Sequence, residues 1–399
     1  MEKTWVSIPD VLFFQEGPGV RNTQYTTEGV KLLNVANLVG GKIDLSTSDR
    51  YISEEEAYGK YKHFLCDAGD FIIASSGIKV EYIDKKMGFV DDTMLPLCMN
   101  TSTIRFKVLD EKKLRIRYFM YYLKSQNFKE QLFRQITGSA QLNYGPSHLK
   151  KMLMPLISVG KQDEIVACMD KVQNIIDIRQ QELVYLDTLI KARFVEMFGD
   201  CRLNPKGWVT KNLDQVADVG SSKRVFVEEL QSEGIPFYRG TEVGALAEGK
   251  LIRPELFITE EHYKQLCEAT GKPQKGDLLM PSICPDGRIW VVDTDAPFYF
   301  KDGRVLWVHL TSKNYNPVFL LYTLKDRIMT DYKSIASGTT FAELKIFALK
   351  KCRIFDVPLS LQNQFAAFVA EVDKSKVAVQ KALEEMQLLF DSLMQQYFG

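Results

Sequence analysis

The sequence predicts an α+β protein in which two similar, β-rich mixed domains alternate with two long helices. Two observations support this fold class. The chain repeats itself almost from end to end, and within each copy the hydrophobic pattern changes from strand-like runs to one long helical stripe. We expect the two helices to pack as an antiparallel coiled coil, and the two copies to be related by an internal pseudo-two-fold symmetry.

The repeat keeps its order along the chain at an offset of 200 to 207 residues. The matching positions are Trp5-Val6 with Trp208-Val209, Ile52 with Ile258, Gly69-Asp70 with Gly276-Asp277, Leu149-Lys150-Lys151 with Leu349-Lys350-Lys351, Pro155 with Pro358, and Phe198-Gly199 with Phe398-Gly399. So many matches in the same order are not expected by chance. The chain is therefore two copies of one unit.

The first part of each copy contains short runs typical of strands, such as "FIIAS", "IWVVD" and "VLWVHL", separated by Gly, Asn and Asp turns. This pattern predicts a mixed domain built on antiparallel sheet. The boundaries that follow are a first domain over 1–155, a first helix over 156–200, a second domain over 201–357 and a second helix over 358–399.

The second part of each copy carries apolar residues at seven-residue spacing, which is the pattern of a coiled-coil seam. Each stripe needs an apolar partner, and the first helix must lead back into the second domain, so the two helices are predicted to pair antiparallel. Gly199 is a natural C-cap for the first helix. The predicted interface residues are Ile165, Met169, Val172, Ile176, Leu183, Leu186, Ile190 and Met197 in the first helix, and Phe365, Val372, Val379, Leu383, Met386, Phe390 and Leu393 in the second.

Composition and charge restrict the class of protein without choosing the function. The chain is 45% hydrophobic and 26% charged, as expected of a globular protein, and its formal net charge of zero gives no bulk signal for nucleic acid. No apolar run is long enough to cross a membrane, and the N-terminus does not resemble a signal peptide. The seven cysteines are scattered, which favours reduced thiols in a cytoplasmic protein over disulfides or a zinc site.

The sequence lacks the usual catalytic motifs. It has no phosphate-binding glycine loop, no dinucleotide fingerprint, no nucleophile elbow and no paired metal-ligand histidines. Neither copy contains a catalytic set that the other repeats. We therefore predict a binding protein rather than an enzyme, with no metal site and no catalytic residues.

Several polar loops have the chemistry for DNA contact, because Arg and Lys can bond guanine, Asn and Gln can bond adenine, and short hydroxyls and backbone amides can bond phosphates. These loops occur at matching places in both copies but differ in sequence, as expected of two domains that read different short sequences. The candidate DNA-binding residues are Arg21, Asn22, Thr23, Gln24, Ser75, Ser76, Lys79, Ser139, Gln141, Asn143 and Tyr144 in the first copy, and Ser222, Lys223, Arg224, Arg239, Ser282, Arg288, Thr339 and Thr340 in the second.

The order of these features resembles the specificity subunit of type I restriction-modification systems. The resemblance is carried by the alternation of variable domain and long helix, the Gly-Asp strand before a Ser-Gly loop, the Gly-Ser/Thr phrase, Gln162 to Ile165 at the start of the first helix, and "FVEMFGD…NPKGW" at its end. The second copy departs from this pattern with "PSICPDG" and "LQNQFAAF".

This resemblance implies a non-catalytic subunit whose two target recognition domains each read one half of a bipartite site in double-stranded DNA. It implies that the helices set the distance between the domains and dock two methylation subunits, and that restriction subunits join the full complex. S-adenosylmethionine, and ATP with magnesium for restriction, would then be bound by the partner subunits rather than by this chain. Adenine would be the methylated base, flipped out of the duplex.

Two other functions remain open on the sequence. One is a specificity module for another class of methyltransferase-nuclease, and the other is a protein-binding scaffold whose coiled coil brings chains together. A self-contained, metal-dependent nuclease using Pro285-Asp286 and Asp331-Tyr332-Lys333 is a further alternative, but this pattern is short enough to occur by chance.

Overall fold

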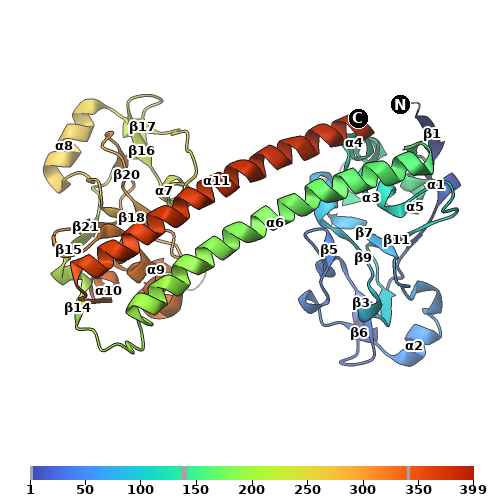
Figure 1. Ribbon diagram of the computed structural model, residues 1–399, viewed down its shortest axis with the longest axis horizontal. Helices are drawn as coiled ribbons and strands as arrows, with labels where there is room; N and C mark the ends of the chain where they lie inside the picture. Colours follow the sequence, from blue (N-terminus) through green and yellow to red (C-terminus); the bar gives the residue numbers. More distant parts are fainter. Residues whose placement is uncertain (1–2, 136–141, 339–341) are drawn as a thin grey trace. The chain divides into compact units, whose positions relative to one another are not determined.

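The computed structural model describes residues 3–135, 142–338 and 342–399, and the chain divides into two compact units. Unit 1 comprises Met1–Gln180 with Lys381–Gly399, and unit 2 comprises Gln181–Gln380. Each unit contains strands, short helices and one end of each of the two long helices, α6 (Val159–Phe198) and α11 (Leu359–Phe398), which Figure 1 shows in green and red. The predicted fold class is confirmed.

The central sheet of unit 1 is antiparallel and has the strand order β2-β11-β7-β9. A smaller sheet has the order β10-β3-β6, in which β10 and β3 are parallel and β3 and β6 are antiparallel, so the predicted antiparallel pairing holds for the main sheet and for part of the smaller one. The elements of unit 1 before α6 are β1 (Thr4–Ser7), α1 (Ile8–Val11), β2 (Leu12–Glu16), β3 (Val30–Leu33), β4 (Leu38–Val39), β5 (Lys42–Ile43), β6 (Tyr51–Ile52), α2 (Glu54–Tyr58), β7 (Phe71–Ala74), β8 (Ser76–Ile78), β9 (Met87–Phe89), β10 (Leu97–Met99), β11 (Thr103–Val108), α3 (Ile116–Lys124), α4 (Gln126–Gln135), β12 (Leu142–Asn143), α5 (Pro146–Leu149) and β13 (Leu153–Leu156).

Unit 2 repeats this plan. Its main sheet has the order β15-β21-β18-β19, and its smaller sheet has the order β17-β16-β20 with a parallel β16–β20 pair. The elements between the long helices are β14 (Thr210–Asn212), β15 (Ala217–Ser221), β16 (Ile235–Tyr238), α7 (Gly240–Ala247), β17 (Phe257–Ile258), α8 (Glu260–Thr270), β18 (Leu278–Pro281), β19 (Trp290–Val291), β20 (Tyr299–Phe300), β21 (Val305–Leu310), α9 (Pro317–Ile335), β22 (Ala336–Ser337), β23 (Glu343–Leu344), α10 (Ile346–Lys350) and β24 (Arg353–Phe355).

The long helices pack against each other within each unit, start against end. In unit 1, residues of the first half of α6 such as Met169 share a core with Phe390 and Phe398 near the end of α11. In unit 2, Ile190 near the end of α6 shares a core with Phe365 near the start of α11. A start-to-end contact in both units means that the pair is antiparallel.

The predicted interface positions differ in burial. Those with less than one tenth of their surface exposed are Ile165, Met169, Val172, Ile176, Ile190, Met197, Phe365, Val372, Val379 and Phe390. Those that are half-buried are Leu183, Leu186, Leu383, Met386 and Leu393. Leu383, Met386 and Leu393 nevertheless pack against the core of unit 1, and Leu186 packs against the core of unit 2.

Four buried aromatic and methionine residues lie outside the predicted seven-residue pattern, namely Phe194, Phe198, Met394 and Phe398. Phe198 stacks edge to face on Phe319 of α9, with ring centroids 4.7 Å apart, and Phe398 lies 5.1 Å from the ring of Tyr118 in α3. The end of each long helix therefore buries a wider stripe than a coiled-coil seam, because it contacts both the other long helix and a domain.

The ends of α6 are set by local chemistry. Gly199 has a φ of 86°, and its N–H donates to the carbonyl of Val195 at 2.8 Å, so the residue ends the helix in the left-handed conformation that glycine adopts readily. Pro155 lies within β13, opposite Trp5, whereas Pro358 directly precedes α11. The predicted match of these two prolines is therefore wrong. The helices repeat at an offset of 200 residues, so the residue equivalent to Pro358 in the first copy is Ser158.

A glutamine in the first turn of each long helix joins the helix to its domain. Gln162 is fully buried; its amide nitrogen donates to the carbonyls of Lys113 and Ile157, both at 2.8 Å, and its oxygen accepts from the backbone N–H of Arg115 at 2.8 Å. Gln362 makes the same three types of bond in unit 2, to Asn314, Val357 and Asn316. Each buried glutamine thus provides partners for three backbone groups at the joint between helix and domain.

Replacing Gln162 with leucine keeps the volume but leaves two carbonyls and one N–H of unit 1 without partners. We expect Q162L to lower the free energy of unfolding by about 3 kcal/mol, because each buried unpaired polar group costs about 1–3 kcal/mol. Chemical denaturation followed by tryptophan fluorescence and circular dichroism measures this loss. The control is Q387L, at an exposed position of α11 that bonds only to Asp391 one turn away, and a loss equal to that of the control would contradict the role of Gln162.

Candidate nucleic-acid interface

The first candidate loop of unit 1, residues 17–26, leaves β2 and contains the 3-10 helix Asn22–Gln24. Arg21, Asn22 and Thr23 are exposed, so their side chains are available to a ligand. Gln24 is not free in the same way, because its amide nitrogen donates to Glu56 at 2.6 Å and to the hydroxyl of Tyr61 at 3.0 Å. The sequence-predicted group thus separates into three exposed residues and one that holds the loop in place.

The second predicted group of unit 1 surrounds the strand β8. Ser75 is buried and its hydroxyl donates to Glu16 at 3.3 Å, while the hydroxyl of Ser76 bonds to that of Ser102 at 2.6 Å. Tyr144 is also buried, and its hydroxyl donates to the carbonyl of Ala74 at 2.9 Å. Burial raises the pKa of Tyr144, so the phenol stays protonated and keeps this bond.

These contacts give Ser75 and Tyr144 a structural place in the domain rather than a surface position. Lys79 differs from them because it is exposed, at the start of a 3-10 helix. Asn143 lies in β12, opposite Ser76 of β8. Ser139, Gln141, Thr339 and Thr340 lie outside the described residues.

The first loop of unit 2, residues 222–231, follows β15. Lys223 and Arg224 are exposed, and the guanidinium of Arg224 lies 5.0 Å from the ring centre of Phe226, which is itself half exposed. The hydroxyl of Ser222 donates to the carbonyl of Phe300 at 2.6 Å. Ser222 therefore supports the loop, and the two cations and Phe226 form its outer surface.

The remaining predicted residues of unit 2 are tied to neighbours. Ser282 is buried at the end of β18. The guanidinium of Arg288 pairs with Asp286 at 2.8 Å and with Glu248 at 3.7 Å. Because its charge is already balanced by two carboxylates, Arg288 is less suited to bind phosphate than an unpaired arginine.

Arg239 also has carboxylate partners. It pairs with Glu242 at the start of α7, and with Glu255 at 3.1 Å. Burial opposes ionisation of Glu242, but the hydrogen bonds from Arg239 outweigh it and lower the pKa of Glu242 to about 2. The same bonds raise the pKa of Arg239. Arg239 thus holds the segment that contains Glu255 against α7.

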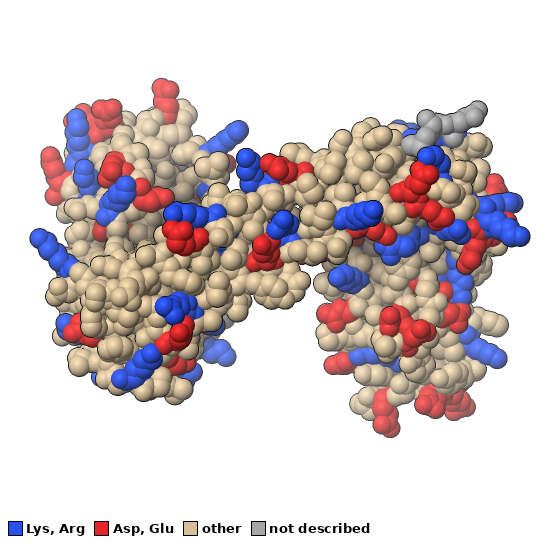
Figure 2. Space-filling view, viewed as in Figure 1, with Lys and Arg blue, Asp and Glu red and all other residues tan. Residues whose placement is uncertain are grey.

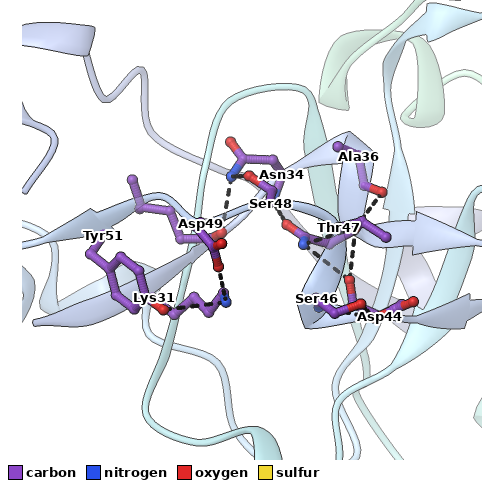
Figure 3. A network of polar contacts seen from close by, with 11 residues as sticks. Lys31, Asn34, Ala36, Asp44, Ser46, Thr47, Ser48, Asp49 and Tyr51 are labelled. Atoms are coloured by element: carbon purple, nitrogen blue, oxygen red, sulfur yellow. Dashed lines mark hydrogen bonds and ion pairs between the residues drawn. The ribbon is translucent and has the colours of Figure 1, made fainter. Parts of the chain in front are cut away.

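A loop that the sequence did not single out, residues 44–50 of unit 1, is held by the polar network in Figure 3. Asp44 accepts from the N–H of Ser46 at 2.9 Å, and the hydroxyl of Thr47 lies 2.9 Å from the carbonyls of both Ala36 and Asp44. Asp49 pairs with Lys31 at 3.1 Å. The loop contains no recognisable sequence motif, so its network of hydrogen bonds is seen only in the structure.

The described part of the chain contains no cluster of three or more His, Cys, Asp or Glu side chains arranged to hold a metal ion. Among the described helices, none has the length and apolar character needed to span a membrane.

Comparison with known proteins identifies related chains. The family model described as the type I restriction modification DNA specificity domain matches residues 24–187 and again residues 205–386. A Haemophilus influenzae protein that bears the provisional name type I restriction enzyme specificity subunit S.HindORF215P is 24% identical, over 72% of this chain and 71% of its own length. The type I restriction enzyme MjaVIII specificity subunit of Methanocaldococcus jannaschii is also 24% identical, over 44% of this chain and 41% of its own.

Solved structures agree on the fold. The S subunit of a type I restriction-modification system from M. genitalium matches with a TM-score of 0.53 and 17% identity, over 100% of this chain and 96% of that one. A chain from a study of complex assembly and conformational transition of the type I R-M system matches with a TM-score of 0.56 and 17% identity, over 99% and 97%.

Replacing Arg239 with alanine tests the brace between α7 and the segment containing Glu255. We expect R239A to lower the free energy of unfolding at neutral pH by about 1 kcal/mol, since the pair is partly exposed to solvent. The folded pKa of Glu242 is depressed from 4.5 to about 2, so this stabilisation is present above pH 4.5 and disappears as the pH falls toward 2. Denaturation of wild type and R239A across that window measures the effect.

The difference between the two proteins should therefore shrink as the pH falls from 4.5 toward 2. R353A serves as the control, because Arg353 is exposed and makes no ion pair with any described residue. A difference that stays constant down to pH 2 would contradict the assignment of the stabilisation to Glu242.

Proposed function

The chain belongs to the family of type I restriction modification DNA specificity domains, and on that premise we propose that it is the non-catalytic DNA-recognition subunit of a type I restriction-modification complex. Each unit reads one half of a bipartite site in double-stranded DNA. Methylation and cleavage take place on partner subunits, which bind S-adenosylmethionine, and ATP with magnesium, respectively.

The observation that carries this proposal is a shared scaffold with different loops. The sheets β2-β11-β7-β9 and β15-β21-β18-β19 have the same order of equivalent strands. The loops that follow their first strands differ: exposed Asn22 and Thr23 in unit 1 correspond to a segment with exposed Phe226 and Val227 in unit 2. Amide and hydroxyl groups suit hydrogen bonding to base edges, and apolar groups suit the methyl of thymine. Two such loops on one chain favour two different half-sites.

We propose that the long helices set the distance between the half-sites and dock two methylation subunits. Support for docking comes from apolar side chains that the helices leave exposed. Val184 and Tyr185 of α6 are each 61% exposed, and Leu388 of α11 is 71% exposed. Exposed apolar residues on a helix that already buries one seam are suited to a helical partner. Restriction subunits would join the complex through the methylation subunits or this chain.

Modified-base sequencing of the host genome, with and without the gene, tests the proposal. We expect one split motif to lose adenine methylation in the deletion strain, and the chain to copurify with a separate methyltransferase subunit. An unchanged methylation pattern, together with no copurifying methyltransferase, would reject the function and favour a protein-binding scaffold. Metal-dependent cutting of DNA by the purified chain alone would instead indicate a nuclease.

The role of the helices as a spacer makes a separate prediction. Deleting seven residues from the middle of each helix, 177–183 and 377–383, keeps the seam in register and shortens each helix by about 10 Å, at 1.5 Å per residue. We expect the methylated motif to keep both half-sites but to lose about three base pairs of spacer, at about 3.4 Å per base pair. The methylome of a strain carrying the shortened protein measures the spacer, and an unchanged spacer would contradict the spacing role.

A further inference from the structure

Most arginines of this protein are neutralised by carboxylates of their own unit. Figure 2 shows Lys and Arg mixed with Asp and Glu over the displayed face, so charge alone marks no site on that face. Arginines with a carboxylate within ion-pair distance are Arg105, Arg115, Arg117, Arg134, Arg193, Arg202, Arg239, Arg288, Arg304 and Arg327. Those that are exposed and make no ion pair within the described ranges are Arg21, Arg50, Arg224, Arg253 and Arg353.

Two of the unpaired arginines of unit 1 lie in neighbouring loops. A β-bridge joins Thr26 to Tyr51, with the N–H of Thr26 donating to the carbonyl of Tyr51 at 3.0 Å. This bridge brings the first loop, which contains Arg21, beside the second loop, residues 44–50. The guanidinium of Arg50 lies 5.2 Å from the ring centre of Tyr25, and one of its nitrogens donates to the Tyr25 hydroxyl at 3.4 Å.

The second loop of unit 1 is held by internal hydrogen bonds and carries the exposed side chain of Arg50. The contacts in Figure 3 use the polar groups of Asp44, Ser46 and Thr47 within the loop. Lys31 balances the carboxylate of Asp49, the residue next to Arg50. The positive charge of Arg50 is therefore left available on a preorganised loop, which reduces the entropy lost when a ligand binds.

Unit 2 has the same arrangement with different residues. The bridge between Gln231 and Phe257 is the counterpart of the Thr26–Tyr51 bridge, with N–H to carbonyl distances of 2.8 and 3.1 Å. It brings the first loop, with Arg224, beside a second loop, residues 249–256, that contains Arg253. Arg239 forms an ion pair with Glu255 of this second loop, as Lys31 does with Asp49 in unit 1.

The two units thus share a pair of unpaired arginines but not the residues around them. A feature common to two domains that read different sequences should bind what all DNA sequences share, and that is the phosphate backbone. The exposed neighbours differ, since unit 1 presents Asn22 and Thr23 whereas unit 2 presents Phe226 and the fully exposed Leu251. Base reading is the task suited to the residues that differ.

We propose that each unit holds the DNA backbone between two arginines, Arg21 with Arg50 in unit 1 and Arg224 with Arg253 in unit 2. The second loop of each unit is thereby a DNA-contacting segment, and Arg50 and Arg253 bind phosphates rather than bases. This inference rests on the proposed function, because it requires that the loops face DNA. It assigns the phosphate contacts to positions that are chemically equivalent in both units.

The test uses the full chain purified with its methylation subunit, and duplexes that carry the methylated split motif or a scrambled sequence. We expect R50Q and R253Q each to weaken binding to both duplexes about tenfold. The slope of log K against log salt concentration should become about 0.9 less steep for each arginine removed. The methylated motif of each variant should be unchanged, because phosphates carry no sequence information.

R353Q is the matched control, since it removes the charge of another exposed arginine that makes no ion pair with a described residue, in β24 and outside both loops. Equal thermal unfolding temperatures would show that all three variants fold. Salt slopes of R50Q and R253Q equal to that of R353Q would overturn the inference, and so would a changed motif at an unchanged slope, which would indicate base contacts. If the wild-type complex itself neither bound the motif nor methylated it, the proposed function would fail instead.

Discussion

The core of each unit depends on the contact between the two long helices, because each core includes residues of both α6 and α11. The core of unit 1 includes Phe398, the last residue of α11, and the core of unit 2 includes Phe198 at the end of α6. Both phenylalanines are fully buried, and burying such a side chain contributes about 1.5–3 kcal/mol. The core of unit 1 therefore needs the end of α11, which is distant in sequence, whereas the core of unit 2 lies within the continuous segment Gln181–Gln380. Both cores include residues of both long helices, which ties the folding of each unit to the pairing of these helices.

A second constraint on the fold is that buried carboxylates must have partners, and the two copies meet it with different residues. Asp70 and Asp277 are equivalent buried aspartates at the start of the main sheets, and each must have partners because a buried carboxylate without them is costly. Asp70 pairs with Arg105, at 3.2 Å, whereas Asp277 accepts from the indole of Trp307 at 2.8 Å and bonds to His309 at 2.8 Å. The acceptor is retained and its donors are exchanged, so satisfaction of the buried charge, rather than the identity of the pair, is what the fold requires.

The sequence predicted the helices and the repeat because both are periodic, and periodicity is a local property of the chain. It used Phe198 and Phe398 as markers of the repeat but did not predict their burial, because they contact a domain as well as the other helix. It placed Ser75 among surface residues because its partner Glu16 is distant in sequence. The sequence analysis did not select Arg50, because an arginine without an ion pair is recognised only when all its neighbours are known. The fold, not the local sequence, determines those neighbours.

The loops are braced by contacts that differ between the units. In unit 1, Gln24 fixes the first loop to α2 through Glu56, and Lys31 holds the second through Asp49. In unit 2, Arg239 holds the second loop through Glu255. Because these braces lie at the base of the loops, the exposed residues can change without disturbing the cores that position them. Under the proposed function, a domain of this kind would acquire a new half-site by substitutions at its loop surfaces, while the proposed arginine contacts with the phosphate backbone would be retained.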